Sequence, residues 1–323
     1  MNLNEIKKPV AAHLKEFDKV FKKAVKSNVP LLNIVMQYII KSKGKQMRPV
    51  IVLYSAELFD NINESTYRGA TLVELLHTAT LVHDDVVDDS YQRRGKFSIN
   101  AIWRNKIAVL AGDFLLSRGL LTALESKDYN LLEIASRAVK DMSEGELLQI
   151  EKARKLDISE EVYYEIIRQK TASLLASCFA IGAASAGVDK TTTELMRQIG
   201  ENLGMAFQIK DDLLDFGDSS QTGKPTGIDI KEKKMTLPII YLLNNSNKSG
   251  KKKIINTIKK HNNDKAKVNE LIETVRKSGG IDYAREKMDE FKNNALELLS
   301  KMPDNEARAM LIELVNFTID RKK

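Results

Sequence analysis

Apolar residues recur every three or four positions along almost the whole chain, which is the spacing of one face of an α-helix. Two of these stripes are long and regular: Leu72, Leu75, Leu76, Ala79 and Val82, and later Leu203, Ala206, Phe207 and Leu214. The β-branched run 50–54 would suit a strand, but it continues into a helical pattern, so we interpret it as a buried helix that Pro49 opens. The pattern predicts an all-α protein of many helices.

Turn-forming or charged residues interrupt this pattern at several places. These breaks are Ser42–Gly44, Asp60–Asn61, Arg94–Gly95, Ser126–Asp128, Lys155–Asp157 and Gly217–Gly227. No solenoid repeat and no low-complexity linker separates the segments between them. We therefore expect one all-helical domain that covers residues 1–323.

Composition supports this interpretation and narrows the setting. The 323 residues include only 16 Gly and 6 Pro, so helix breakers are scarce. The single cysteine, Cys178, excludes an internal disulfide, and the N-terminus has no apolar signal core, so we expect a cytoplasmic protein. The net charge is +7, but the lysines of residues 248–266 stand among Asn and Ser, which is typical of a solvated surface. No aromatic residues interleave with them, so we expect no nucleic-acid partner.

The first candidate for chemistry is the segment His83–Asp89, which places four aspartates at the end of the stripe from Leu72. Asp84 and Asp88 are four apart and share a helix face, where like charges repel, and a helix C-terminus disfavours anions. A compensating cation would remove this cost, and carboxylates without His or Cys favour a hard ion such as Mg²⁺. A solvated acidic helix end is the alternative for this cluster alone.

The same D-D-x-x-D spacing returns much later, in Asp211, Asp212 and Asp215, again at the end of an apolar helix. Gln208 lies one turn before Asp211. Two copies of a spacing in which like charges repel are less expected by chance than one, so the repetition favours metal binding. If the two helices are neighbours in a bundle, the carboxylates could face one cavity.

Basic residues lie near both clusters, as a site for a diphosphate requires. The candidates are Lys45, Arg48, Arg93, Arg94, Lys170 with Thr171 at the expected opening of an Ala-rich helix, Lys224 and Lys234. His77 lies seven residues before Asp84 and therefore on the same face of the predicted helix.

With these residues together, the chain resembles the trans-polyprenyl diphosphate synthase family over most of its length. The matching blocks are Gly44-Lys45-x-x-Arg48-Pro49, Glu74-x-x-His77, Asp84-Asp85-x-x-Asp88, Arg93-Arg94-Gly95, Gly112-Asp113, Lys170-Thr171, Phe207-Gln208-x-x-Asp211-Asp212-x-x-Asp215 and Gly223-Lys224-Pro225. Within the family it most resembles the catalytic component (component II) of bacterial two-component heptaprenyl diphosphate synthases. It departs from the family at Gln46-Met47, and at Lys233, where a glycine is common.

The resemblance implies the isoprenoid synthase fold, a bundle of helices around a deep central cavity, and a role for each motif. The implied ligands of Mg²⁺ on the allylic diphosphate are Asp84, Asp85, Asp88, Asp211, Asp212 and Asp215. The residues implied to contact that diphosphate are Arg93, Lys170, Thr171, Gln208, Lys224 and Lys234. The residues implied to hold isopentenyl diphosphate are Lys45, Arg48, His77 and Arg94. Of these, we expect the six aspartates and Lys170 to act in catalysis.

Product length should depend on the residues one and two turns before Asp84, which are Ala79, Thr80 and Leu76. None is aromatic, so we expect a long tunnel and a long product, with the resemblance favouring heptaprenyl diphosphate for a quinone such as menaquinone. The resemblance also implies a smaller partner subunit (component I) or a homodimer, with a transient membrane-surface contact for product release. The alternatives are a class I terpene cyclase and a non-catalytic helical subunit of a prenyltransferase.

Overall fold

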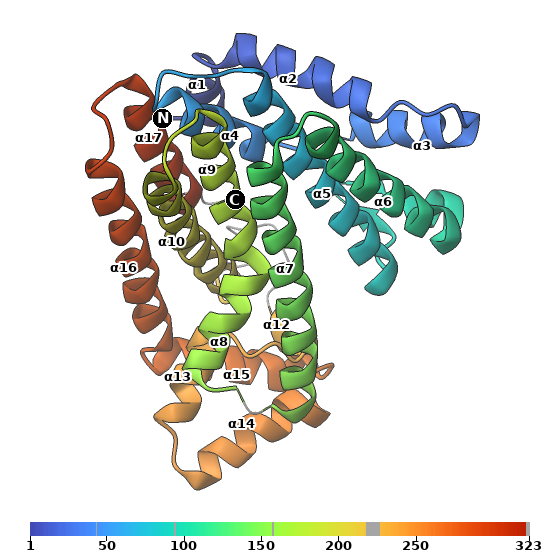
Figure 1. Ribbon diagram of the computed structural model, residues 1–323. Coiled ribbons are helices and arrows are strands. Elements are labelled where there is room, and N and C mark those ends of the chain that lie inside the picture. The colour runs from blue at the N-terminus through green and yellow to red at the C-terminus, as the bar shows by residue number, and fades with distance from the viewer. Residues whose placement is uncertain (43, 94, 157, 218–226, 321–323) are drawn as a thin grey trace. The chain divides into compact units, whose positions relative to one another are not determined.

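The computed structural model describes residues 1–42, 44–93, 95–156, 158–217 and 227–320. Helices make up nearly all regular structure in these residues, so the all-α prediction is confirmed (Figure 1). The helices are α1 (Leu3–Lys7), α2 (Ala11–Ala24), α3 (Pro30–Lys41), α4 (Met47–Glu57), α5 (Glu64–Val87), α6 (Ile99–Glu125), α7 (Tyr129–Lys155), α8 (Glu160–Ile167), the π-helical turn η1 (Arg168–Ala172), α9 (Ser173–Ser185), α10 (Lys190–Leu214), α12 (Ile228–Lys231), α13 (Leu237–Asn244), α14 (Lys248–Lys260), α15 (Lys265–Lys277), α16 (Gly280–Ser300) and α17 (Glu306–Asp320). A short antiparallel pair, β1 (Gln92–Arg93) and β2 (Lys96–Phe97), follows α5.

Most of the predicted breaks are turns in the structure. Asp60, Lys127 and Leu156 each adopt the left-handed conformation, with φ of 53°, 59° and 53°, which stops the preceding helix. Gly95 does the same between β1 and β2, with φ of 73°. The last predicted break, Gly217–Gly227, falls largely on residues 218–226, outside the described residues.

Contacts divide the chain into two compact units, which are described separately. The first unit comprises residues 1–139, 176–197 and 300–313, and the second comprises 140–175, 198–299 and 314–323. Several long helices, among them α7 and α10, contribute residues to both units. The expectation of one all-helical domain over residues 1–323 stays a prediction.

The core of the first unit forms around α5, which contacts α2, α4 and α6. The predicted stripe on α5 is buried, and α4 is buried from Pro49 to Ala56, as the interpretation of residues 50–54 as a helix required. Gly182 of α9 allows close packing on α4, because a Cβ there would lie 2.4 Å from the carbonyl oxygen of Val52. The helix that carries the first aspartate cluster is therefore held on several sides.

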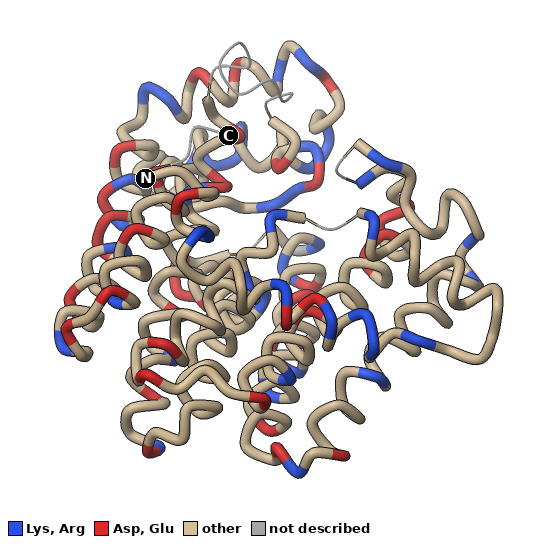
Figure 2. Tube along the Cα trace, turned by 90° about the horizontal axis from the view of Figure 1, so that it is seen from above, with Lys and Arg blue, Asp and Glu red and all other residues tan. Residues whose placement is uncertain are grey.

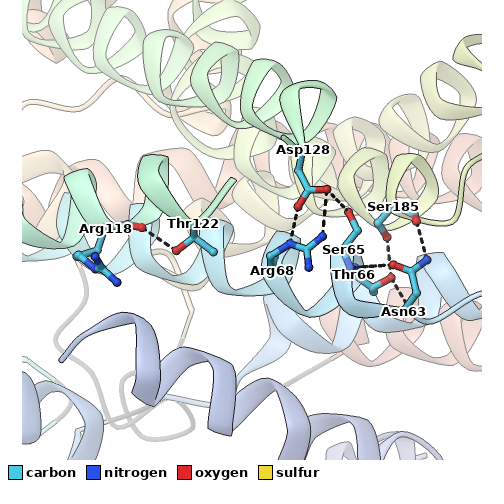
Figure 3. Close-up of polar contacts among 8 residues, drawn as sticks. All are labelled: Asn63, Ser65, Thr66, Arg68, Arg118, Thr122, Asp128 and Ser185. Atoms are coloured by element: carbon cyan, nitrogen blue, oxygen red, sulfur yellow. Dashed lines mark hydrogen bonds and ion pairs between the residues drawn. The ribbon is translucent and has the colours of Figure 1, made fainter. Parts of the chain in front are cut away.

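The N-terminus of α5 is fixed by side chains from three elements (Figure 3). Asn63 caps the helix by accepting from the backbone N–H of Ser65 at 2.8 Å, and its amide donates to the carbonyl oxygen of Ser185 at 2.9 Å. Asp128 accepts from the hydroxyl of Ser65 at 2.8 Å and from Nε of Arg68 at 2.6 Å. This network anchors one end of α5, whose other end carries the aspartates.

In the second unit, α8 is joined to α16 by aromatic and polar contacts. Glu160 accepts hydrogen bonds from the hydroxyls of Tyr164 at 2.9 Å and Tyr283 at 2.6 Å, and Tyr164 packs edge-on against Phe291. The apolar body of each tyrosine packs in the unit while its hydroxyl keeps a partner. These contacts hold the segment α8–η1, which carries Lys170 and Thr171.

Candidate functional site

The first aspartate cluster lies at the C-terminal end of α5, where Asp88 is the C-cap. Asp84 and Asp88 are exposed, whereas Asp85 is only 3% exposed and accepts a hydrogen bond from Nε of Arg93 at 2.7 Å. Asn100 of α6 donates to the backbone carbonyl oxygen of Asp85 at 3.0 Å. The three aspartates therefore differ: Asp85 positions Arg93, while Asp84 and Asp88 present carboxylates to solvent.

His83, next to the cluster, contacts a pair of residues on α6. Its Nε2 lies 3.2 Å from the carbonyl oxygen of Val109 and 3.4 Å from a carboxylate oxygen of Asp113. A Cβ on Gly112 would lie 2.2 Å from Nε2, so only glycine leaves room for the ring. This contact gives the Gly112-Asp113 motif a physical role, which is to receive the end of α5.

A pocket opens beside the first cluster, with about 780 Å³ of space, part of it open to solvent. Its polar lining includes His77, Asp85 and Arg93, together with Glu74, which lies one turn before His77. Its apolar lining includes Phe17, Phe21, Tyr38, Ile39 and Leu81. A pocket with a cationic and acidic wall and an apolar wall suits a small substrate with a charged head and a hydrocarbon tail.

Two more of the residues predicted to hold isopentenyl diphosphate, Lys45 and Arg48, lie just before α4 and in its first turn. Gly44 and Gln46 line the pocket, while Lys45 between them is exposed and Arg48 is half-buried in the first turn of α4. Gln46 adopts a left-handed conformation with φ of 51°, which turns the chain into the helix. Arg94 lies outside the described residues.

The predicted chain-length residues occupy a different face of α5. Leu76 and Ala79 are each 2% exposed and Thr80 is half-buried. Leu76 faces α6, where a Cβ on Gly119 would lie 3.4 Å from its side chain. The pocket is lined by Thr78 and other residues of the neighbouring face, so a tail path along the first face stays a prediction.

The second cluster ends α10, and its central carboxylate is buried in a chain of hydrogen bonds. Asp212 is 7% exposed, and it accepts from the hydroxyl of Tyr163 and from the amide of Gln208, both at 2.8 Å. The hydroxyl of Thr171 donates in turn to Gln208 at 2.8 Å. Burial raises the pKa of Asp212 to about 7, and the charge of Asp229 adds to the effect. The structure thus brings together Thr171, Gln208 and Asp212.

Asp215 connects the cluster to the segment that follows it. Its carboxylate accepts from the backbone N–H of Ile228 at 2.9 Å and of Asp229 at 3.2 Å, at the start of α12. Burial, together with the charge of Asp215, raises the pKa of Asp229 to about 6. Lys234 lies 3.7 Å from the Asp229 carboxylate and 2.5 Å from that of Glu232.

Lys233 stands where the family commonly has a glycine, and this difference has a structural consequence. Lys233 adopts a left-handed conformation with φ of 59°, which glycine takes at little cost. Its turn still brings the N–H of Lys234 to 2.8 Å from the carbonyl oxygen of Asp229. Lys234 therefore faces carboxylates despite the missing glycine. Lys224 lies outside the described residues.

The expectation that Lys170 and Thr171 open a helix is wrong. Both lie in the π-helical turn η1, in the middle of a helical run from Glu160 to Ser185. Two glycines make room for it: a Cβ on Gly145 of α7 would lie 2.7 Å from the backbone nitrogen of Lys170, and one on Gly204 of α10 would lie 2.4 Å from Cα of Ala172. The ammonium of Lys170 pairs with Glu146 and donates to Gln149 at 3.3 Å.

The clusters do not form a ready-made metal cage. Among the residues that the structure describes, no group of three or more His, Cys, Asp or Glu side chains is close enough to hold an ion. The donor chemistry nevertheless fits Mg²⁺, which keeps several waters, shares phosphate oxygens and needs only one or two carboxylates. The charge of Asp215 helps to raise the pKa of Asp229, and the charge of Asp229 helps to raise that of Asp212, which is the kind of repulsion that a cation relieves.

Sequence reasoning missed Tyr163, Asp229, Glu146 and His83 as parts of these sites. Tyr163 and Glu146 are remote in the sequence from the residues they contact, and no pattern marks them. His83 could have been noticed, because it adjoins Asp84 on the predicted helix.

Comparison with known proteins shows the same family throughout. The sequence profile described as "Polyprenyl synthetase" matches residues 29–275. The all-trans-nonaprenyl-diphosphate synthase (geranyl-diphosphate specific) of Rhodobacter capsulatus is 34% identical over 98% of this chain and 97% of its own length. Heptaprenyl diphosphate synthase component 2 of Geobacillus stearothermophilus is 33% identical over 90% of each chain. The crystal structure of polyprenyl synthase from Caulobacter crescentus CB15, complexed with calcium and isoprenyl diphosphate, superposes with a TM-score of 0.90, at 34% identity and covering 100% of this chain and 98% of that one.

Proposed function

Because the chain belongs to the polyprenyl synthetase family, the trans-polyprenyl diphosphate synthases, we propose that it condenses an allylic diphosphate with successive isopentenyl diphosphates into a long all-trans polyprenyl diphosphate. Farnesyl diphosphate is the proposed primer. The observation that carries the proposal is the pair of D-D-x-x-D clusters, each at the end of a long helix and each with a partner on another element, Arg93 of β1 for Asp85 and Tyr163 of α8 for Asp212.

The residues divide the work as follows. Asp84, Asp85 and Asp88, with Asp211, Asp212 and Asp215, would hold Mg²⁺ at the allylic diphosphate, where the metal would supply positive charge for the departing pyrophosphate. The same diphosphate is contacted by Arg93, which Asp85 positions. The other residues proposed to contact it are Lys170, Thr171, Gln208, Lys224 and Lys234. Lys45, Arg48, His77 and Arg94 hold isopentenyl diphosphate so that its double bond lies near the reacting carbon.

The reaction then needs little covalent help from the protein. The allylic C–O bond breaks and its electron pair leaves with pyrophosphate. The double bond of isopentenyl diphosphate forms the new C–C bond, and a proton is lost to pyrophosphate, which restores an allylic product. The apolar wall of the pocket, with Phe17 and Phe21, excludes the water that would otherwise capture the cation.

A matched set of Asp→Asn variants tests the reaction class. Asp84→Asn and Asp211→Asn should each slow pyrophosphate release, with farnesyl and isopentenyl diphosphates and Mg²⁺, by about 100-fold or more. Asp89→Asn is the control, because Asp89 is exposed beside the first cluster, outside the motif, and its left-handed φ of 47° suits asparagine. Wild-type rates in Asp84→Asn and Asp211→Asn would contradict the assignment.

Product length is proposed to be heptaprenyl (C35), set by Leu76, Ala79 and Thr80. Relatives named as nonaprenyl and heptaprenyl synthases are similar to this chain over 90% or more of its length, which supports local side chains as the source of the difference in product length. Ala79→Phe should shorten the product, as measured by mass spectrometry. Thr80→Phe is the second variant, because its half-buried site tolerates bulk better. Unchanged product length in both folded variants would contradict the path.

We also propose that the enzyme is cytoplasmic, supplies a quinone side chain such as that of menaquinone, and works as a homodimer or with a smaller component I. Helix α6 supports a partner surface, because Ile102, Val109, Leu110, Leu121 and Leu124 are exposed along it. Among the described residues, α6 is the one helix that is long and apolar enough to cross a membrane. A single helix of this kind is weak evidence for a membrane span, because core helices of globular proteins have the same length and composition. Light scattering together with activity of the purified chain alone tests the partner: a fully active monomer would contradict both assemblies.

A further inference from the structure

Helix α14 presents a surface of lysines without acidic neighbours in the sequence. Between Glu232 and Asp264 the chain contains eight lysines and no aspartate or glutamate. Six of them lie on α14 and all six are exposed: Lys248, Lys251, Lys252, Lys253, Lys259 and Lys260. Elsewhere basic and acidic residues are interspersed over much of the chain (Figure 2). The six lysines of this helix carry a charge nearly as large as the net charge of the whole protein, which is +7.

This arrangement opposes helix stability. Lys251 and Lys252 lie three and four residues after Lys248 near the N-terminus of α14, where they repel Lys248 and the positive end of the helix dipole. No acidic residue occupies the first turn, where one would be stabilising. Among the described residues, Lys253 is the one of these six lysines that forms an ion pair, with Glu270 of α15 at 2.7 Å, and both side chains are exposed. An external anion would remove the repulsion that the fold itself leaves.

The geometry of α14 indicates what kind of surface it suits. Its apolar side is already used, since Ile254, Thr257 and Ile258 are buried and the helix packs on α15 (Figure 1). The helix therefore has no free apolar face to insert between lipid tails. It contains no aromatic residue to stack on bases and no arginine to read them, which disfavours nucleic acid. A row of lysines suits a membrane surface of anionic headgroups, which attracts clusters of four to eight basic residues.

We propose that the lysine surface of α14 docks the protein reversibly on anionic membranes. The purpose of this contact rests on the proposed function, because a long polyprenyl diphosphate is a lipid and must pass from the enzyme to a bilayer. The attraction is electrostatic, so it weakens as salt shortens the screening length from about 10 Å at 0.1 M to about 3 Å at 1 M. Each lysine near the surface strengthens membrane partitioning by roughly five-fold.

The test is co-sedimentation of the purified full chain with vesicles of phosphatidylcholine, alone or mixed with phosphatidylglycerol. The wild type should bind only the mixed vesicles and should be released at about 1 M NaCl. A variant with Lys251→Gln, Lys252→Gln, Lys259→Gln and Lys260→Gln should bind roughly 600-fold more weakly, because four lysines each contribute about five-fold. Pyrophosphate release from soluble farnesyl and isopentenyl diphosphates should be unchanged in it, which separates failure of docking from failure of the proposed enzyme.

The matched control removes the same charge from α2, through Lys15→Gln, Lys19→Gln, Lys22→Gln and Lys23→Gln. These lysines are also exposed, but Glu16 and Asp18 stand among them. The control should retain most of the vesicle binding. The proposal is overturned if the α14 variant binds like the wild type, if the α2 control loses as much as the α14 variant, or if duplex DNA at equal phosphate concentration is bound as tightly as the mixed vesicles.

Discussion

Gly204→Ala should separate the position of the π-helical turn η1 from the chemistry of the residues it carries. In the structure a Cβ at Gly204 would lie 2.4 Å from Cα and 2.7 Å from Cβ of Ala172. Carbon atoms at ordinary contact are about 3.5–4.0 Å apart, so the backbones of α10 and η1 must separate by about 1 Å. Thr171 directly precedes Ala172, and its 2.8 Å hydrogen bond to Gln208 would be stretched or lost.

The cost in stability should be small, although the cost in activity should not. Overpacking of this kind costs about 1–3 kcal/mol. The better helix propensity of alanine offsets about 1 kcal/mol of that. Net destabilisation should therefore be about 0–2 kcal/mol, which leaves a folded protein. Because Thr171 is proposed to contact the diphosphate, a shift of about 1 Å in its position should lower kcat by roughly 10- to 100-fold.

Urea unfolding and steady-state kinetics on the same preparation measure the two effects. Gly119→Ala is the control for unfolding, because it is also a helix-interior substitution but brings its Cβ no nearer than 3.4 Å to a neighbour. It should leave stability unchanged or improve it. The reasoning is refuted if Gly204→Ala unfolds at the wild-type urea concentration and keeps the wild-type kcat.

Three further predictions follow from single contacts. Tyr163→Phe removes the hydroxyl that donates to Asp212, so the Mg²⁺ concentration for half-maximal activity should rise by a few-fold, and an unchanged Mg²⁺ curve would count against the contact. Lys233→Gly relieves a left-handed φ and should stabilise the fold by about 0.5–1 kcal/mol in urea unfolding, whereas Lys231→Gly, at the last residue of α12, should not; equal effects would disprove the strain argument. Mg²⁺ together with pyrophosphate should raise Tm. At a ligand concentration a hundred times the dissociation constant, the rise should correspond to about 2.7 kcal/mol of added stability. The rise should be smaller in Asp211→Asn and undiminished in Asp89→Asn.

The sequence predicts the helical frame well because α5 and α10 are long and regular. Each keeps its apolar stripe to the turn that holds the aspartates, so the place of both clusters on their helices could be read from spacing alone. Periodicity did not reveal η1, because helical spacing continues on both sides of the one wide turn, and only the phase of the apolar stripe shifts there. The helix opening expected at Lys170 was wrong for this reason.

Contacts between remote positions were also beyond the reach of the pattern. Tyr163 reaches Asp212 only because α8 and α10 pack together, and neither residue signals the other. The fit of His83 over Gly112 depends on the way α5 and α6 meet. The sequence shows Gly112 as part of a motif but does not explain why a glycine is needed there. The contact with the His83 ring explains it.

The proposed reaction is tested most directly by mass spectrometry of the products that the purified chain makes from farnesyl diphosphate, isopentenyl diphosphate and Mg²⁺. We expect a ladder of linear polyprenyl diphosphates, each one isoprene unit longer than the last, which ends near heptaprenyl and disappears when the metal is chelated. Cyclic hydrocarbons, or consumption of farnesyl diphosphate with no uptake of isopentenyl diphosphate even when component I is supplied, would contradict the proposal.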